Sequence, residues 1–374
     1  MSSVGKFSPY VVALRGVGIA VLLFSLSAIA AAQHYNQTNL VSDLPGHAAH
    51  RDPNLVNAWG IARAPGGPWW VADNGTGVST LYDSTGAGFP PPPHGPLVVH
   101  IPTPPDVTPP AAPTGIVFNG SPDFEVAPGM PAVFIFVTED GTISGRNPGV
   151  DPFHAVLKVN KSPGAVYKGV TIAEGNFDRF LYVANFRGGR IDVFNNKFEH
   201  VRLSDDAFTD SELPEGFVPF NVQNIGHNLY VTFAKQDDKK HDQIDGEGLG
   251  YVDVFGVDGK LLQRLEHGIW FNSPWGVALA PGDFGEFSHH ILVGNFGSGH
   301  IAAFNSVSGK FAGVLKNPDG TILTVDRIWG ISFGNSAIAG PYNALFFAAG
   351  PKDEQHGLFG MITAVDQEQD GDEQ

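Results

Sequence analysis

Short apolar runs alternate with turn residues along most of the chain. In one stretch the runs 291–295 (ILVGN), 299–304 (GHIAAF) and 310–315 (KFAGVL) follow one another, separated by segments rich in Gly, Ser and Asn. Short apolar runs bounded by such residues predict β-strands and tight turns. The sequence after residue 32 shows no convincing 3.6-residue periodicity, so the pattern predicts an all-β protein.

A four-residue phrase of the type Ala58–Ile61 (AWGI) recurs six times. Its third residue, which is Gly in five copies and Asn in one, falls at positions 60, 115, 169, 221, 276 and 330. This near-constant spacing leaves room for four short strands in each repeat. Four-stranded units repeated around an axis are the blades of a propeller. We therefore predict an all-β, six-bladed β-propeller with four-stranded antiparallel blades.

The recurring phrase has a physical interpretation in this fold. Its Gly opens the innermost strand, where the blades converge and leave little room for a side chain. Beside it stand aromatic residues, which we expect to pack between blades because aromatic side chains bury large apolar surfaces. These residues are Trp59, Tyr167, Phe220, Trp275 and Trp329.

The sixth repeat is one strand short. After residues 358–363 (LFGMIT) the sequence becomes polar and acidic. An incomplete blade would leave an open sheet edge, which invites aggregation. Residues 35–41 (YNQTNLV) precede the first repeat and read as a strand, so we predict that they close the ring by pairing within the sixth blade.

The two ends of the chain have other compositions. Residues 1–32 hold only two charges, Lys6 and Arg15, and the apolar run 16–32 ends in small residues. This pattern predicts a secretory signal peptide cleaved near Ala32, and the alternative is an uncleaved membrane anchor. The expected organisation is thus a signal peptide at 1–32, a propeller at 33–365 and a disordered acidic tail at 366–374. We expect a secreted protein, extracellular or periplasmic, without a membrane span in the mature chain.

Composition excludes several functional classes. The chain of 374 residues has 22 Lys and Arg against 38 Asp and Glu, a formal net charge of −16. A nucleic-acid partner is not expected, because phosphate contacts need clustered basic residues. The absence of Cys excludes disulfides, thiolate catalysis and Cys-ligated zinc.

Particular motifs resemble known propellers. Residues 273–281 (SPWGVALAP) with 291–310 resemble an NHL-type repeat. The chain from 35 to 365, with motifs such as DPNLVNAWGIA, WWVADNGTGVSTLYD and FIFVTEDGTISGRNP, resembles an uncharacterised family of exported bacterial six-bladed propellers. That resemblance implies the TolB-like superfamily, which also contains gluconolactonase-like lactonases and strictosidine-synthase-like proteins. It implies the fold and transfers no activity.

In four of the six repeats a carboxylate or carboxamide side chain stands two residues after the same position of the predicted second strand. We expect these four side chains on the same face of the propeller, around its axis. These candidate metal ligands are Asp73, Glu139, Asn185 and Asn295. Oxygen donors from several blades suit Ca²⁺, which takes six to eight oxygen ligands. The resemblance adds that gluconolactonase-like enzymes similarly hold a divalent ion near the axis, although their motifs do not match here residue by residue. The other interpretation, that these side chains form the turns at strand ends, remains open.

Polar groups in the loops on the same face are candidates for ligand binding. Two loops of similar composition, 235–242 and 351–357, each combine acids, Lys and one His, and such a His can act as a general base near neutral pH. A solvated charge run is the alternative. The candidate ligand-binding residues are Asn57, Asp140, Asn272, Asp326, His241 and His356.

The sequence leaves three functions open. The leading hypothesis is an exported binding module that recognises a small polar ligand or a protein partner on its axial face, with a structural Ca²⁺. The alternative is a metal-dependent hydrolase or lyase of the lactonase or esterase type that uses the central site. A structural protein of the envelope is the third. No nucleophile elbow, HExxH motif or phosphate-binding loop is present, so catalytic residues stay unassigned and the sequence does not decide whether the protein is an enzyme.

Overall fold

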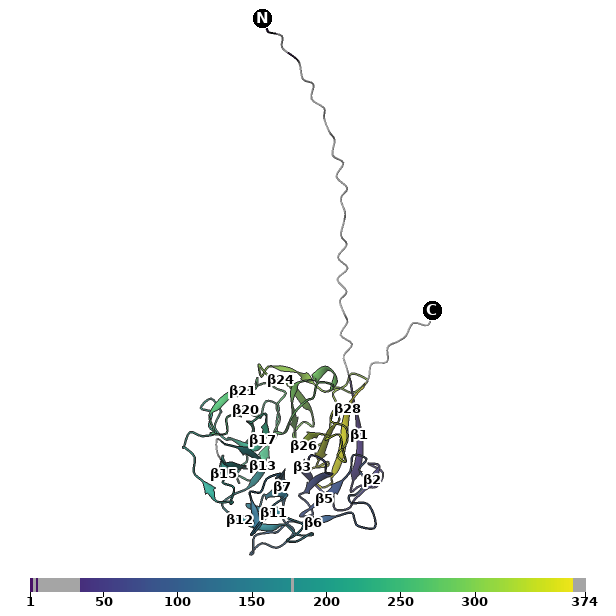
Figure 1. Cartoon of the computed structure of the whole chain (residues 1–374), viewed down its shortest axis with the longest axis vertical. Helices are drawn as coiled ribbons and strands as arrows, with labels where there is room; N and C mark the ends of the chain where they lie inside the picture. The colour runs from purple at the N-terminus through teal and green to yellow at the C-terminus, as the bar shows by residue number, and fades with distance from the viewer. Residues whose placement is uncertain (3–4, 6–33, 176–177, 366–374) are drawn as a thin grey trace. The chain divides into compact units, whose positions relative to one another are not determined.

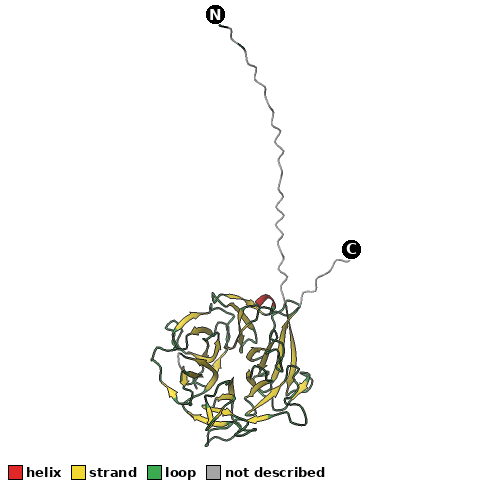
Figure 2. Cartoon of the chain, viewed as in Figure 1, coloured by secondary structure: helices red, strands yellow, loops and turns green. Residues whose placement is uncertain are grey.

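Six β-sheets are arranged around a common axis (Figure 1). The computed structural model describes residues 1–2, 5, 34–175 and 178–365. The expected signal peptide, apart from residues 1, 2 and 5, and the expected acidic tail lie outside the described residues. Strands dominate the ring, and the described residues contain one helical segment, the 3-10 turn η1 (Gly285–Phe287) (Figure 2). The all-β six-bladed propeller predicted from the repeat is confirmed.

Each of the first three blades pairs four strands in an antiparallel sheet. Blade 1 contains β3 (Ala58–Arg63), β4 (Trp69–Asp73), β5 (Val78–Tyr82) and β6 (Val98–His100). Blade 2 contains β7 (Pro113–Phe118), β10 (Phe134–Thr138), β11 (Thr142–Arg146) and β12 (Val156–Asn160), with the small hairpin β8 (Glu125–Ala127) and β9 (Met130–Pro131) beside them. Blade 3 contains β13 (Tyr167–Glu174), β14 (Arg179–Asn185), β15 (Arg190–Phe194) and β16 (His200–Val201).

The remaining blades follow the same order from the axis outward. Blade 4 contains β17 (Phe217–Ile225), β18 (Asn228–Gln236), β20 (Tyr251–Phe255) and β21 (Leu261–Arg264), with β19 (Gln243–Ile244) paired to β18. Blade 5 contains β22 (Pro274–Leu279), β23 (His290–Asn295), β24 (Ile301–Asn305) and β25 (Phe311–Val314). Blade 6 contains β26 (Ile328–Phe333), β27 (Leu345–Ala349) and β28 (Leu358–Ala364).

Blade 6 is completed from the other end of the chain. β1 (Tyr35–Ser42) pairs antiparallel with β28 from Tyr35 opposite Ala364 to Ser42 opposite Leu358, and β2 (His50–Arg51) adds to β1 in parallel. The Tyr35 ring is fully buried, and its hydroxyl donates to the carbonyl of Phe284 at 3.0 Å. The predicted closure of the ring by an N-terminal strand is confirmed.

The Gly residues of the repeated phrase lie where neighbouring blades come closest. A Cβ atom on Gly60 would stand 2.4 Å from the carbonyl oxygen of Thr114 in blade 2, and one on Gly276 would stand 2.4 Å from that of Trp329 in blade 6. Both distances are far below a van der Waals contact. The expectation that these positions have no space for a side chain is confirmed.

The aromatic residues of the phrase do more than pack between adjacent blades. Trp59 stacks on Trp329 with ring centroids 3.7 Å apart, and Trp275 meets Trp329 edge to face at 5.9 Å. Trp59 also contacts Trp275, although blades 1 and 5 are not neighbours. The rings therefore pack across the axis itself. We call this set the axial aromatic cluster; its members are Trp59, Phe186, Phe220, Trp275, Phe296 and Trp329.

One aromatic residue of the predicted set is absent from this cluster. Tyr167 packs instead in the core shared by blades 2 and 3, and its hydroxyl donates to Asp192 at 3.2 Å. In blade 3 the residue directly before the Gly, at the place of Trp59, is Lys168. In the third repeat the aromatic residue thus stands one position earlier in the phrase, which places its side chain in the core rather than at the axis.

Candidate binding site at the propeller axis

The four predicted metal ligands do stand at the ends of second strands, but they do not share one environment. Asp73 ends β4, Asn185 ends β14 and Asn295 ends β23, while Glu139 follows β10. Asp73 is fully buried beside Thr80, and this burial raises the pKa of its carboxyl group well above the ordinary value. A neutral carboxyl group is a poor ligand for a cation.

The two asparagines of the set serve their own blades. Asn185 donates to the carboxylate of Asp192 at 2.8 Å and accepts from the N–H of Gly188 at 2.9 Å. Asn295 accepts from the N–H of Asn272 at 3.0 Å. Their amide groups therefore hold turns. Of the two carboxylates among the four candidates, Glu139 joins a group of described acidic and histidine residues whose ligand atoms could surround an ion, and Asp73 does not.

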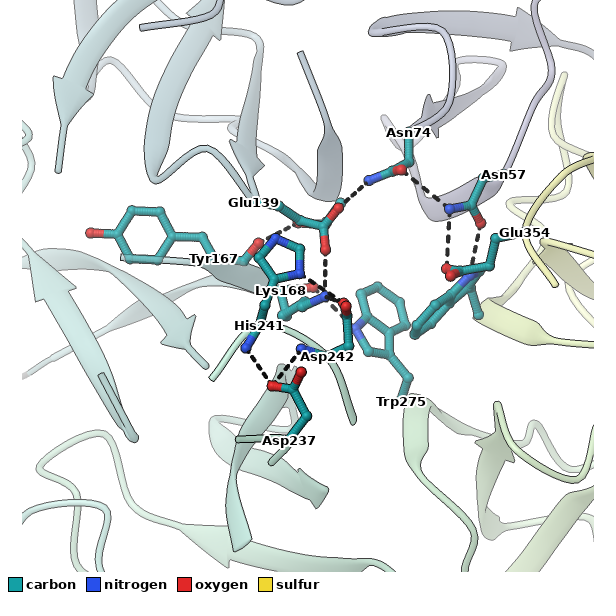
Figure 3. A network of polar contacts seen from close by, with 12 residues as sticks. Asn57, Asn74, Glu139, Tyr167, Lys168, Asp237, His241, Asp242, Trp275 and Glu354 are labelled. Carbon is teal, nitrogen blue, oxygen red and sulfur yellow. Dashed lines mark hydrogen bonds and ion pairs between the residues drawn. The ribbon is translucent and has the colours of Figure 1, made fainter. Parts of the chain in front are cut away.

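Glu139 stands at the centre of a polar network above the axial aromatic cluster (Figure 3). Its Oε2 accepts from Asn74 Nδ2 at 2.9 Å, and its Oε1 forms an ion pair with Nζ of Lys168. The same ammonium group lies 3.4 Å from Oδ1 of Asp242, which is paired in turn with Nδ1 of His241 at 2.8 Å.

The network continues toward blade 6. Asn57 Nδ2 donates to Oδ1 of Asn74 at 3.2 Å and to Oε1 of Glu354 at 3.1 Å. The Oδ1 atom of Asn57 accepts from the indole N–H of Trp329 at 3.1 Å, which joins the network to the aromatic rings. We call these seven residues the axial belt: Asn57, Asn74, Glu139, Lys168, His241, Asp242 and Glu354. They come from five of the six blades.

Lys168 is the most unusual member of the axial belt. Its side chain is only 1% exposed, and its Nζ lies 5.0 Å from the ring centroid of Trp59 and 5.7 Å from that of Phe186. Burial opposes a charge on this amine, but the negative charges of Glu139 and Asp242 outweigh burial and raise its pKa. Lys168 is therefore a buried ammonium ion held between carboxylates and aromatic faces.

The axial belt carries more negative than positive charge. Burial and the like charge of Glu139 raise the pKa of Glu354. The hydrogen bond from His241 lowers the pKa of Asp242 to about 2, and the same bond raises the pKa of His241. Three carboxylates thus face one lysine and one histidine, and the pKa of Glu354 is raised first by its burial and then by the charge of Glu139.

A metal ion has one candidate position among the described residues. One ligand atom each of Glu139, His241 and Asp242 lie within 4.8 Å of one another. Two carboxylates and an imidazole suit ions such as Zn²⁺ or Mn²⁺ better than Ca²⁺, which prefers oxygen ligands throughout. Lys168 already contacts both carboxylates, so an ion would share them with an ammonium group.

Two of the six predicted ligand-binding residues, Asn57 and His241, belong to the axial belt. Two others brace loops instead. Oδ2 of Asp140 accepts from the N–H of Ala112 at 3.0 Å, and Oδ1 of Asn272 accepts from that of Gly246 at 2.7 Å.

The last two candidates also connect loops rather than join the axial belt. Oδ2 of Asp326 accepts from the N–H of Lys352 at 3.0 Å. Nδ1 of His356 pairs with Asp43 at 2.7 Å, so it ties blade 6 to the segment after β1. The loop 351–357 nevertheless contributes to the axial belt, through Glu354 rather than His356.

Sequence reasoning missed Lys168, Asn74, Asp242 and Glu354 as site residues. A signal for Lys168 was present, because a single Lys occupies a position that is aromatic in four repeats. Asp242 and Glu354 lie in or beside the two loops that the sequence already singled out. The acidic residues of these two loops could not be distinguished from solvent-exposed charges without knowing which side chains point toward the axis.

Comparisons with known proteins give relatives but no activity. No family model matches the chain. The uncharacterized proteins R648 and L690 of Acanthamoeba polyphaga mimivirus are each 31% identical over 334 residues, which cover 86% of this chain and 78% and 84% of theirs. Among solved structures, a streptogramin B lyase is similar in fold alone, with 13% identity and a TM-score of 0.49 over 89% of this chain and 98% of that one.

Proposed function

The chain belongs to the same family as the mimivirus proteins R648 and L690, and from the site itself we propose that it is an exported binding module, because those relatives supply no activity. The module recognises a small polar ligand at the axial belt. The observation that carries this proposal is the buried ammonium group of Lys168, paired with the largely buried Glu139 and the exposed Asp242. Buried charges are costly, so a protein that keeps them at a ring axis commonly uses them.

The chemistry of the axial belt indicates what the ligand carries. Glu354 has a carboxylate with a raised pKa, and its one hydrogen bond to a side chain comes from Asn57. A ligand with hydroxyl or amine groups would donate hydrogen bonds to Glu354 and Glu139 and offset their mutual repulsion. The aromatic rings below give such a ligand a rigid floor.

Thermal melts of the full chain against a panel of sugars, polyols, small amines and amino acids test the proposal. A ligand at 100 times its Kd raises the stability by about 2.7 kcal/mol. We expect a panel member to raise the melting temperature of the wild type and to lose this effect in Glu354→Gln. The matched control is Glu125→Gln on the exposed strand β8. The proposal fails if no panel member shifts the melt, or if the shift survives in Glu354→Gln.

A metal-dependent hydrolase or lyase is the second candidate function. The observation in its favour is the group of Glu139, His241 and Asp242. A divalent ion bound there would polarise a carbonyl group and lower the pKa of a bound water. The Ca²⁺ expected from the sequence fits this donor set less well than Zn²⁺ or Mn²⁺.

Elemental analysis and melts with and without EDTA address the ion. The second candidate predicts a bound metal and a lower melting temperature in EDTA, and predicts that His241→Ala loses both. A lactone and ester panel, with Glu139→Gln as the inactive variant, then addresses catalysis. If the protein contains no metal and EDTA does not change its melting temperature, this candidate is rejected. That result does not contradict the binding module.

Export rests on the composition of residues 1–32. A signal peptide predicts that the mature protein begins near Gln33. N-terminal sequencing of the protein from a secreting host checks this, and a mature protein that still begins at Met1 would contradict it.

A further inference from the structure

The outer edge of blade 3 is more open than those of blades 1, 2, 4 and 5. β16 pairs with only two residues of β15, Val193 and Phe194. In blade 4 the outer strand pairs one residue further, with Asp253, and the N–H of Leu265 then donates to the carbonyl of Val252 at 2.9 Å. Blades 1, 2 and 5 have the same closing bond, on the carbonyls of Gly77, Gly141 and Ile301.

The sequence alone would not predict this difference. Residues 191–194 of blade 3 read IDVF, and residues 252–255 of blade 4 read VDVF. Arg202 and Leu203 follow the outer strand of blade 3, and they correspond in sequence to Arg264, the last residue of β21, and Leu265 in blade 4. If blade 3 were paired as blade 4 is, Arg202 would lie opposite Asp192, and the N–H of Leu203 would donate to the carbonyl of Ile191. The hydrogen bonds and ion pairs of the described residues include neither contact.

The chain leaves this edge instead and is held elsewhere. Arg202 turns outward, 84% exposed, to pair with Asp205 at 3.2 Å. The N–H of Phe208 donates to the carbonyl of Gly259 at 2.8 Å, and the Phe208 ring packs against Tyr182 and Phe255. These contacts anchor the segment in the core shared by blades 3 and 4.

A cavity of about 500 Å³ lies beside the open edge. Its walls include Ile191 and Asp192 of β15 on one side and Leu203 and Phe208 on the other. Leu265, the residue of blade 4 that corresponds to Leu203, is 2% exposed at the matching place. In blade 4 the matching place is therefore occupied by a buried leucine that directly follows β21, and the cavity beside blade 3 has the size of a typical ligand site.

We propose that this edge of blade 3 accepts an extended peptide segment of a partner protein. The segment pairs its main chain with Ile191 as an added strand and places an apolar side chain in the cavity. Unpaired strand edges bind extended peptides in this way, with main-chain bonds giving affinity and a side-chain pocket giving selectivity. The occupant is inferred from the outer strands of the other blades, and the site shares no residue with the axial belt.

A synthetic peptide with the sequence of residues 260–266 (KLLQRLE) is the probe, because this segment pairs with the near-identical third strand of blade 4. We expect saturable binding to the full chain by fluorescence anisotropy. The control peptide carries Leu265→Pro, which removes the N–H that makes the closing bond. Its affinity should be at least about tenfold lower, the equivalent of about 1.4 kcal/mol.

Amide hydrogen exchange of the full chain locates the binding. The expected result is slow exchange at Ile191 only when the peptide is present, with no change at Glu139 or Glu354. Binding without protection at Ile191 would place the peptide elsewhere and overturn the proposal. The absence of binding would overturn it too, and slow exchange of the Leu203 N–H in the free protein, like that expected for Leu265, would then show that Arg202 and Leu203 close the edge themselves.

Discussion

The axial aromatic cluster and the axial belt occupy neighbouring levels at the propeller axis, yet different physics holds each together. The aromatic side chains of the cluster are at most 5% exposed and touch across the axis. Their burial stabilises the propeller through the hydrophobic effect, which does not depend on the orientation of polar partners. The axial belt buries charges, which is unfavourable unless each charge meets a well-placed partner. The cluster therefore serves mainly stability, and the belt is where ligand chemistry can occur.

The two levels are nevertheless joined. The indole N–H of Trp329 donates to Asn57, and that of Trp275 donates to the carbonyl of Lys168 at 3.0 Å. The aromatic cluster thus positions two belt residues. Substitutions that separate packing from charge pairing test how far this division holds.

The largest effect is expected from Trp329→Ala. This change empties the middle of the axial aromatic cluster, where Trp329 meets Trp59, Phe220, Trp275 and Phe296. Loss of a buried aromatic residue costs about 3–5 kcal/mol of unfolding free energy. Urea denaturation checks this, with Leu262→Ala on the exposed surface as the control. A loss below about 1 kcal/mol would mean that the cluster is not a core.

Lys168→Met should follow, with a loss of about 3 kcal/mol. The change keeps the volume but leaves Glu139 without its cation, while Asp242 keeps His241, and breaking a buried pair is costly. The value lies at the low end of the usual range because Asp242 is 62% exposed. Urea denaturation at neutral pH is again the measurement.

A second substitution added to Lys168→Met distinguishes charge pairing in the axial belt from packing in the axial aromatic cluster, because it should restore part of the lost stability. In the double variant Lys168→Met with Glu139→Gln the uncompensated charge disappears, so the loss should shrink by about 1 kcal/mol or more. No second substitution is expected to rescue Trp329→Ala in this manner. A double variant less stable than Lys168→Met would show that Glu139 stabilises the ring by packing rather than by charge.

Asn57→Ala removes one of the two hydrogen bonds between the axial aromatic cluster and the axial belt, and a loss of about 2 kcal/mol is expected. The buried N–H of Trp329 loses its acceptor, which costs about 1–3 kcal/mol. Asn57 also has a positive φ of 47°, which Asn tolerates better than Ala. The control is Asn39→Ala, whose side-chain amide donates an exposed hydrogen bond from β1 to the carbonyl of His47. Equal losses in the two variants would mean that the joint is unimportant.

Glu354→Gln should have the smallest effect, visible as a change in pH dependence. The folded pKa of Glu354 is raised above its value in the unfolded chain. Its contribution to stability is therefore full below the unfolded pKa of about 4.3 and is lost as pH rises through the folded pKa. Melts between pH 4 and 8 should fall less steeply with pH in Glu354→Gln than in the wild type. A steeper fall in the variant would contradict the raised pKa.

The fold was predictable because it repeats. A phrase at near-constant spacing indicates six equivalent units, and the missing strand of the sixth unit indicates closure by residues 35–41. Local patterns suffice for such conclusions, since strand and turn preferences act over a few residues. Tyr167 shows the limit: because the aromatic residue of the third repeat stands one position earlier than in the others, a core tyrosine was included in the predicted set and Lys168 was not.

The axial site was only partly predictable. Asn57, Glu139 and His241 were identified because they stand near strand ends on one face. Asn185 and Asn295 stand at equivalent ends, but their amides turn back to their own blades. Strand position fixes where a side chain starts, and the neighbouring loops decide where its polar group finds a partner.

The sequence by itself thus determined the repeat, the strands, the number of blades and the closure of the ring, because these follow from short-range patterns of apolar and turn residues. The tertiary structure alone decided that Lys168 is a buried ammonium ion and that five blades share the axial belt. It also decided that the outer edge of blade 3 stays open while the near-identical edge of blade 4 is filled. These features depend on contacts between loops that are far apart in sequence, and local sequence patterns do not predict such contacts.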